Sequence, residues 1–177
     1  ERAEAISSYL GIILDKCIDY NSRHCTWHAS RNVIAHTFAR HDFSFSWSHT
    51  EFDASRNLLP WASDQVADAY AGLANLAAPA QLQLQRSFNS ASANRLRITT
   101  GSAHSLERIP DGSIGNITVD PPYYNNVNYA ELSDFFYVWL RRSVGDQYPV
   151  FFDIELTNKD DEAIANPARF HDGRRAA

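Results

Sequence analysis

Two consecutive prolines, Pro121 and Pro122, follow directly after the β-branched run Ile117-Thr118-Val119 and the single residue Asp120. Each proline fixes φ and lacks an N–H, so the pair can neither continue a β-ladder nor enter a helix interior. We therefore expect a buried strand over residues 116–119 that ends at Asp120. A stiff, preshaped loop should follow, with Asp120 at its entrance and Tyr123 at its exit.

The second half of the chain alternates between strand and helix signals. Residues 96–100 are another strand candidate, and a turn or short helix is expected near residues 105–108. Pro110-Asp111-Gly112-Ser113 is turn chemistry, and residues 131–142 have helical spacing with Gly145 after their end. We predict an α/β fold whose α/β portion spans residues 95–177. Beyond about Asp153 the sequence is polar and predicts a loop that wraps back or the end of a fragment.

The first half predicts helices and irregular structure, and we assign residues 1–94 as a segment inserted in, or flanking, the α/β portion. A helix is expected over residues 1–20 and another from about Pro60 to Leu76, with Pro60 in the first turn. The apolar face of the first helix is predicted from residues at helical spacing: Ile6, Leu10, Ile13, Leu14 and Cys17.

Composition excludes several classes of protein. The 177 residues contain no run of about 18 apolar residues and no secretory signal, so we expect a cytoplasmic protein without a membrane span. A net charge of −5 requires any nucleic-acid enzyme of this composition to concentrate its positive charge locally. Four side chains suggest zinc, but their spacing is irregular and His24-Cys25 adjacency suits one tetrahedral ion poorly. We expect no metal at Cys17, His24, Cys25 and His28.

The loop after the predicted strand has residues suited to one kind of ligand. The Asp120 carboxylate can accept a hydrogen bond from an exocyclic amino group, and a rigid aromatic ring such as Tyr123 can stack on a base. Together they suit a planar, amino-bearing ring that has been taken out of a nucleic-acid stack. The alternative is that Asp120 caps a turn and the prolines only shape it.

Asp120-Pro121-Pro122-Tyr123 resembles the catalytic motif of the S-adenosylmethionine-dependent amino-methyltransferases. The run from Tyr123 to Leu140 is similar to a family of large bacterial and archaeal adenine-specific DNA methylase-like proteins that carry an N-terminal domain of unknown function. Residues 40–45, Trp47 and residues 165–170 resemble this family too, so the resemblance covers roughly residues 30–172. It implies a partial Rossmann-like methyltransferase fold with a helical insertion.

The resemblance also implies roles for particular residues. Catalysis would fall to Asp120, Pro121, Pro122 and Tyr123, while Tyr123, Tyr124 and Asn126 would contact the flipped base. Ser102 and Ala103 stand where related enzymes have Gly-Asp-Ala, whose acid contacts the cofactor adenine. Here Ser102 either hydrogen-bonds the cofactor or is an inert loop serine. Gly115 stands where the family has Asp, which is a second departure from the pattern.

The family also needs a Gly-rich loop to admit S-adenosylmethionine, and the seven glycines of this chain include no G-x-G. The chain also contains no Met. We therefore expect a fragment whose cofactor loop lies upstream in a parent protein or has been lost. The parent would methylate adenine N6 of DNA, and the isolated chain would be inactive. Cytosine N4 or RNA as target, and an inactive remnant or nucleic-acid-binding module, are the alternatives.

Overall fold

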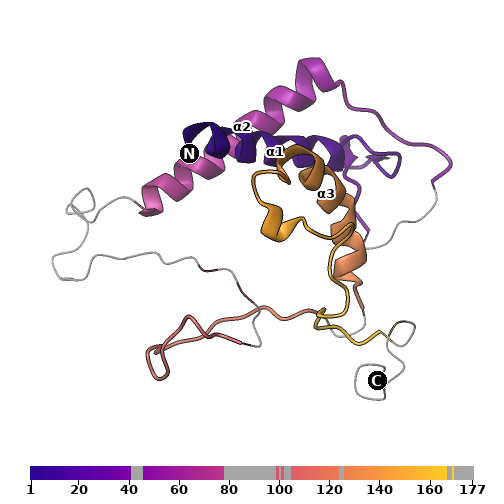
Figure 1. Cartoon of the computed structure of the whole chain (residues 1–177). Coiled ribbons are helices and arrows are strands. Elements are labelled where there is room, and N and C mark those ends of the chain that lie inside the picture. The colour runs from indigo at the N-terminus through magenta and orange to yellow at the C-terminus, as the bar shows by residue number, and fades with distance from the viewer. Residues whose placement is uncertain are drawn as a thin grey trace. The chain divides into compact units, whose positions relative to one another are not determined.

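The computed structural model describes residues 1–40, 46–77, 99, 101, 105–123, 126–166 and 169. These residues form α1 (Arg2–Asp19), β1 (Thr26–His28), β2 (Val33–Ala35), the π-helical turn η1 (Ala54–Leu58), α2 (Leu59–Ala77), α3 (Tyr129–Val144) and the 3-10 turn η3 (Pro149–Phe151) (Figure 1). Internal contacts divide the chain into one unit of Glu1–Ala67 with Pro122–Ala177, and a second unit of Asp68–Pro121. The domain boundary expected between residues 94 and 95 lies outside the described residues.

The three predicted helices are confirmed, each within a few residues of its expected bounds. Pro60 lies in the first turn of α2, where the missing N–H costs nothing. The chain enters that helix through η1, which begins after Asp53. The Asp53 carboxylate accepts hydrogen bonds from Ser55 N at 3.2 Å and Arg56 N at 3.0 Å. These bonds, led by that from Arg56, lower the pKa of Asp53 and fix where the helical segment starts.

The face that α1 turns toward α3 differs from the predicted one. Gly11 is the buried residue of α1, and a Cβ built on it would meet Val144 Cγ1 at 3.4 Å. The two helices therefore pack against each other, and side chains of α3 lie over Gly11 (Figure 1). In contrast, Ile6 and Leu10 of the predicted face are 52% and 59% exposed. Ile13 and Cys17 of the predicted face are half-buried, so this face is buried only in part. The apolar spacing did not indicate that side chains of α3 pack over Gly11.

A β-hairpin closes the C-terminal end of α1. Strands β1 and β2 pair antiparallel, with Trp27 opposite Ile34. Thr37, the second residue after β2, donates from its N and its Oγ1 to the Asp19 carbonyl at 2.8 and 2.7 Å. Cys25 is fully buried beside it, and its Sγ donates to the same carbonyl at 3.3 Å. The last carbonyls of a helix have no hydrogen-bond donors within the helix, and here Cys25 and Thr37, on either side of the hairpin, supply donors for the Asp19 carbonyl.

The segment from residue 105 to 123 contains the predicted turns but not the predicted strand. Ser113 N donates to Pro110 O at 3.2 Å, and Gly112 has φ of +68° at the third turn position, which a type II turn requires. A second turn is closed by Ile109 N and Leu106 O at 2.8 Å. Residues 116–119, however, join no β-ladder among the described residues. Ile117 is 73% exposed, so the prediction of a buried strand was wrong for this structure.

The physical reason is the absence of a ladder partner for this segment in the described part of the chain. An isolated extended segment has unpaired N–H and C=O groups and gains nothing from β-propensity alone. The strand expected at residues 96–100 lies outside the described residues except for Thr99. The sheet that the described residues do contain is the two-stranded hairpin. A Rossmann-like α/β fold therefore stays a prediction.

Candidate functional site

The candidate catalytic loop is exposed along its whole length. Asp120, Pro121, Pro122 and Tyr123 all lie at the surface, and the ring of Tyr123 is 58% exposed. Within the described residues, the Asp120 carboxylate takes part in no hydrogen bond or ion pair. The oxygens of this exposed carboxylate can therefore accept hydrogen bonds from the amino group of a ligand. If Asp120 capped a turn, its carboxylate would accept a hydrogen bond from a nearby backbone N–H, and the described part of the chain contains no such bond.

A tight turn follows the loop and brings two of the predicted base-contacting residues together. Asn126 N donates to Tyr123 O at 2.8 Å, which folds the chain back within four residues. Tyr123 and Asn126 are both exposed, and the hydrogen bond between their backbones brings the two residues close together. Tyr124 was predicted to contact the base as well, and it lies outside the described residues. The loop then passes almost directly into α3, which begins at Tyr129.

The exit of the loop is fixed by the tail of the chain. At the N-terminus of α3 the Ala130 N–H donates to Glu162 Oε1 at 2.8 Å. The Glu162 carboxylate thus caps one of the free N–H groups of the first turn and lies at the positive end of the helix dipole. Asn166 Nδ2 adds a 3.5 Å contact to Asn128 Oδ1, just before the helix. The predicted return of the polar tail is confirmed, because its residues lie against α3.

One helical turn further along α3, Asp134 holds the tail in place. Its Oδ1 accepts from Thr157 N at 2.9 Å and from Thr157 Oγ1 at 2.7 Å, while Oδ2 lies 2.6 Å from Lys159 Nζ. Burial on its own raises the pKa of Asp134, but the hydrogen bonds from Lys159 and Thr157 and the lysine charge outweigh it. The pKa of this carboxyl is therefore below its ordinary value, and the carboxylate stays charged.

Arg169 completes the ionic cluster at the start of α3. Its Nη1 donates to Glu162 Oε2 at 2.8 Å and to the Lys159 carbonyl at 3.0 Å, and its Nη2 pairs with Glu131. Arg169 N also donates to Asn166 O at 3.1 Å. The sequence analysis missed this cluster. The sequence feature that could have indicated it is the group of charged residues at 159–162 and 169, which includes basic partners for the two acidic residues of α3.

The residues predicted to contact the cofactor, Ser102 and Ala103, lie outside the described residues. Their neighbour Gly101 is exposed, and a Cβ built there would meet open space. Gly115, where the family pattern has Asp, is likewise exposed with open space around its Cα. Neither glycine is required here by a close approach of the backbone.

The four candidate zinc ligands have other surroundings. Cys25 Sγ is buried against the Asp19 carbonyl, and burial raises the pKa of the Cys17 thiol, which disfavours the thiolate that zinc needs. Among the described residues, no group of three or more His, Cys, Asp and Glu side chains could hold a metal ion.

The aromatic residues of α3 are candidates for core packing or for base stacking, and Arg141 and Arg142 at its end are candidates for phosphate contacts. Phe135 and Phe136 form a cluster with Phe38, with ring centroids 5.4 and 5.3 Å from it, which supports the core assignment. Arg141 Nε donates to the Phe152 carbonyl at 3.3 Å, and Arg142 lies 5.9 Å from the Trp139 ring. A cavity of about 460 Å³ beside them also contains acidic side chains. Those acids offset the arginines, which favours a structural role over phosphate binding.

No helix in the described part of the chain is both long and apolar enough to cross a lipid bilayer. Comparison with known protein families, curated proteins and solved structures finds no match for this chain.

Proposed function

We propose that this chain is part of an S-adenosylmethionine-dependent methyltransferase that acts on adenine N6 of DNA. One observation carries the proposal: an exposed carboxylate, two prolines and an exposed aromatic ring follow one another at residues 120–123. The sequence on both sides of this loop also resembles the adenine-specific DNA methylase-like family. The fixed start of α3 supports the same function, because it holds the exit of the loop through the Ala130–Glu162 hydrogen bond.

In this proposal the loop positions the target amino group and does not abstract a proton from it. The Asp120 carboxylate accepts a hydrogen bond from one N–H of the amino group, and the Pro121 carbonyl accepts a hydrogen bond from the other N–H. With both hydrogens held, the nitrogen lone pair is directed away from the ring plane, toward a methyl donor. Tyr123 stacks on the flipped base, a contact worth about 1–3 kcal/mol. Orientation and preorganised acceptors supply the rate enhancement.

The described residues do not by themselves fit the cofactor. The glycines at positions 101 and 115 have open space around them, and the segment before Asp120 is exposed. We therefore assign the Gly-rich cofactor loop to another part of the polypeptide, and we expect the isolated chain to be inactive. The cofactor supplies the methyl group, and the residues of this chain hold the base.

The test is transfer of a labelled methyl group to duplex DNA by the polypeptide that contains both this chain and the Gly-rich loop. Asp120→Ala should lower the rate about 100-fold or more, the effect of losing one preorganised polar contact in a transition state. Asp111→Ala is the matched control, since Asp111 is an exposed aspartate in the turn before the loop. Equal melting temperatures would show that both variants remain folded.

Further outcomes distinguish the alternatives. Label in N6-methyladenine that is lost in Asp120→Ala supports the proposal, and unchanged transfer by this variant refutes it. Mass analysis of the modified nucleosides separates adenine from cytosine and DNA from RNA. Absence of transfer together with absence of cofactor binding would instead favour a catalytically inactive, nucleic-acid-binding protein. Tyr123→Phe should retain activity because it keeps the stacking ring, whereas Tyr123→Ala should lose it.

A further inference from the structure

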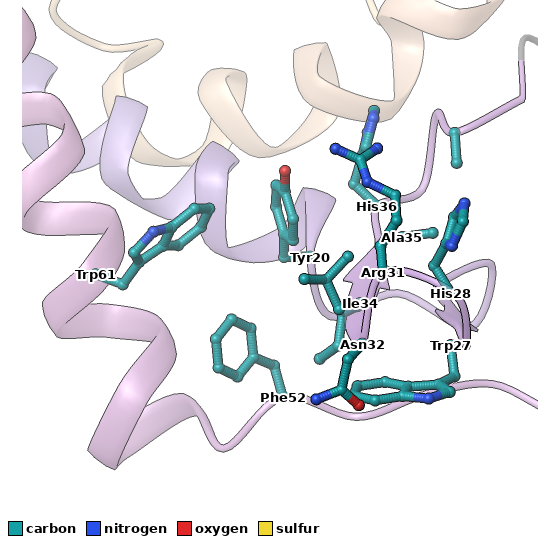
Figure 2. A pocket seen from close by; sticks show the side chains of 12 residues that line it. Tyr20, Trp27, His28, Arg31, Asn32, Ile34, Ala35, His36, Phe52 and Trp61 are labelled. Atoms are coloured by element: carbon teal, nitrogen blue, oxygen red, sulfur yellow. The ribbon is translucent and has the colours of Figure 1, made fainter.

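A cavity of about 790 Å³ lies within the unit formed by Glu1–Ala67 and Pro122–Ala177, and it shares no residue with the Asp120–Tyr123 loop. The end of α1, the start of α2, the hairpin and the segment before η1 contribute its walls. Figure 2 shows Tyr20, Phe52 and Trp61 on one side, with Ile34, Asn32 and Trp27 of the hairpin facing them. Its volume falls in the range of small-molecule sites in proteins.

Aromatic rings form one wall of this cavity. Tyr20 and Trp61 meet edge to face at 4.9 Å between centroids, and Phe52 lies 6.2 Å from Trp61. Trp27 lines the cavity from the hairpin, and the residue is 53% exposed. A tryptophan that serves only as core packing is largely buried, so its exposed ring beside an open cavity is a surface on which a planar ring can stack.

The charge around the cavity favours an anionic ligand. The chain as a whole has a net charge of −5, yet the described residues that line the cavity include no Asp or Glu. They contain the guanidinium group of Arg31, together with His28 and His36. Lys16 adds a second positive charge behind the aromatic wall, with Nζ 5.0 Å from the Tyr20 ring and 4.9 Å from the Trp61 ring.

Acidic groups do approach this region from behind one lining residue. The Asp19 carboxylate lies 3.3 Å from His36 Nδ1, so His36 contributes little net charge toward a ligand. His28 Nδ1 lies 3.3 Å from Ser30 Oγ on the hairpin turn. Arg31 is therefore the cation with which we associate the negative part of the ligand.

The hairpin turn places its polar groups at the edge of the cavity. Arg31 N donates to His28 O at 3.1 Å, which closes the turn between β1 and β2. Asn32 follows with φ of +54°, a left-handed conformation that Asn tolerates better than most residues. Its amide group can donate and accept hydrogen bonds, as the polar edge of a nucleobase requires. Trp27, Arg31 and Asn32 thus present a ring, a cation and an amide within one short hairpin.

We propose that this cavity is a nucleotide-binding site, in which Trp27 stacks on the base and Arg31 pairs with the phosphate. The ligand is a nucleoside monophosphate unit, either free or within a single strand of DNA. This inference does not rest on the methyltransferase proposal, because the cavity has its own residues and binding is measured without methyl transfer.

The test measures binding of two probes to the 177-residue chain: free deoxyadenosine 5′-monophosphate and a short, fluorescently labelled oligodeoxyadenylate. Trp27→Ala should weaken binding roughly five-fold or more, the effect expected from losing one base–aromatic stack. Arg31→Ala should weaken it several-fold and reduce the dependence of affinity on salt, because one phosphate contact is lost. Tight binding of the free nucleotide indicates a free ligand, and binding of the oligonucleotide alone indicates a single strand.

Control variants separate this site from general attraction to the protein surface. Trp47→Ala removes a tryptophan that is 95% exposed, and Arg56→Ala removes an exposed arginine, both outside the cavity lining. Neither should change the affinity. The proposal is overturned if neither probe binds, if the control variants weaken binding as much as the cavity variants, or if deoxyadenosine without phosphate binds as tightly as the nucleotide. Unchanged circular dichroism of Trp27→Ala would show that the hairpin change left the fold intact.

Discussion

Two segments, one before α3 in the sequence and one after it, differ in the hydrogen bonds that they make. The loop over residues 116–123 is exposed throughout and joins no ladder among the described residues, although its sequence is β-branched. The tail over residues 153–166, with few apolar residues, is fixed to α3 by Asp134, Glu162 and their partners. The comparison shows that side-chain hydrogen bonds hold a polar segment against a helix, whereas strand propensity without a ladder partner does not bury a β-branched one.

The largest expected effect in this comparison comes from replacing two aspartates, one at a time, by alanine. Asp134→Ala removes the acceptor for Thr157 N and Oγ1 and the partner of Lys159, so we expect the free energy of unfolding to fall by about 2–3 kcal/mol. Asp120→Ala removes an exposed carboxylate and should change it by no more than about 0.5 kcal/mol. Urea titration of both variants measures the two values.

Acid should produce the same loss without a substitution. The pKa of Asp134 is lowered in the folded state, so the carboxylate stabilises the fold above the unfolded value of 3.8 and this contribution disappears as pH falls through the folded pKa. Equal stabilities for Asp134→Ala and Asp120→Ala at neutral pH would show that the tail is not held by this carboxylate.

A smaller effect is expected from a carboxyl that lies on α1 one turn beyond Gly11. Burial raises the pKa of Asp15 from 3.8 to about 6, and its Oδ1 is buried with no hydrogen-bond partner among the described residues. Here the folded state holds the proton more tightly, so stability should rise as pH falls from about 6 toward 3.8. Asp15→Asn should stabilise the chain by roughly 1 kcal/mol at pH 7 and flatten that rise.

Melting temperatures of wild type and Asp15→Asn across this pH window provide the measurement. The sign of the Asp15 effect is opposite to that of Asp134, which makes the two carboxylates a pair of internal controls. A stability of Asp15→Asn that falls below wild type at pH 7 would show that the charged form has a stabilising partner.

The smallest expected effect sharpens the other side of the comparison. Ile117 and Val119 are 73% and 76% exposed, so Ile117→Ser and Val119→Thr should each change the free energy of unfolding by less than about 0.5 kcal/mol. A buried strand at this place would instead lose about 1–3 kcal/mol through burial of a polar group and lost apolar contact. Chemical denaturation of the two variants therefore decides whether the segment is packed in solution.

Helices were predictable from the sequence because their hydrogen bonds close within four residues. The spacing of apolar residues and the position of Pro60 located α1, α2 and α3 without knowledge of their partners. The face of α1 was not predictable in the same way. Its packing surface includes Gly11, over which side chains of α3 lie, and no property of the α1 sequence alone specifies this contact.

The candidate site divides along the same line. The loop over Asp120–Tyr123 followed from proline chemistry, which acts locally. The cluster of Glu131, Glu162 and Arg169 depends on residues far apart in the sequence, and their charges alone did not reveal the pairing. The cavity beside Trp27 was missed for the same reason, since its walls come from four separate segments.

The hydrogen bond between Ala130 and Glu162 has a consequence for the order of events in synthesis and in local opening. The two residues are 32 positions apart, so the first turn of α3 is capped only after the chain has been extended well beyond the helix. In the native state, the Ala130 amide can exchange its hydrogen with water whenever the tail detaches, without global unfolding. Its exchange rate therefore reports the free energy that keeps the exit of the Asp120–Tyr123 loop in place.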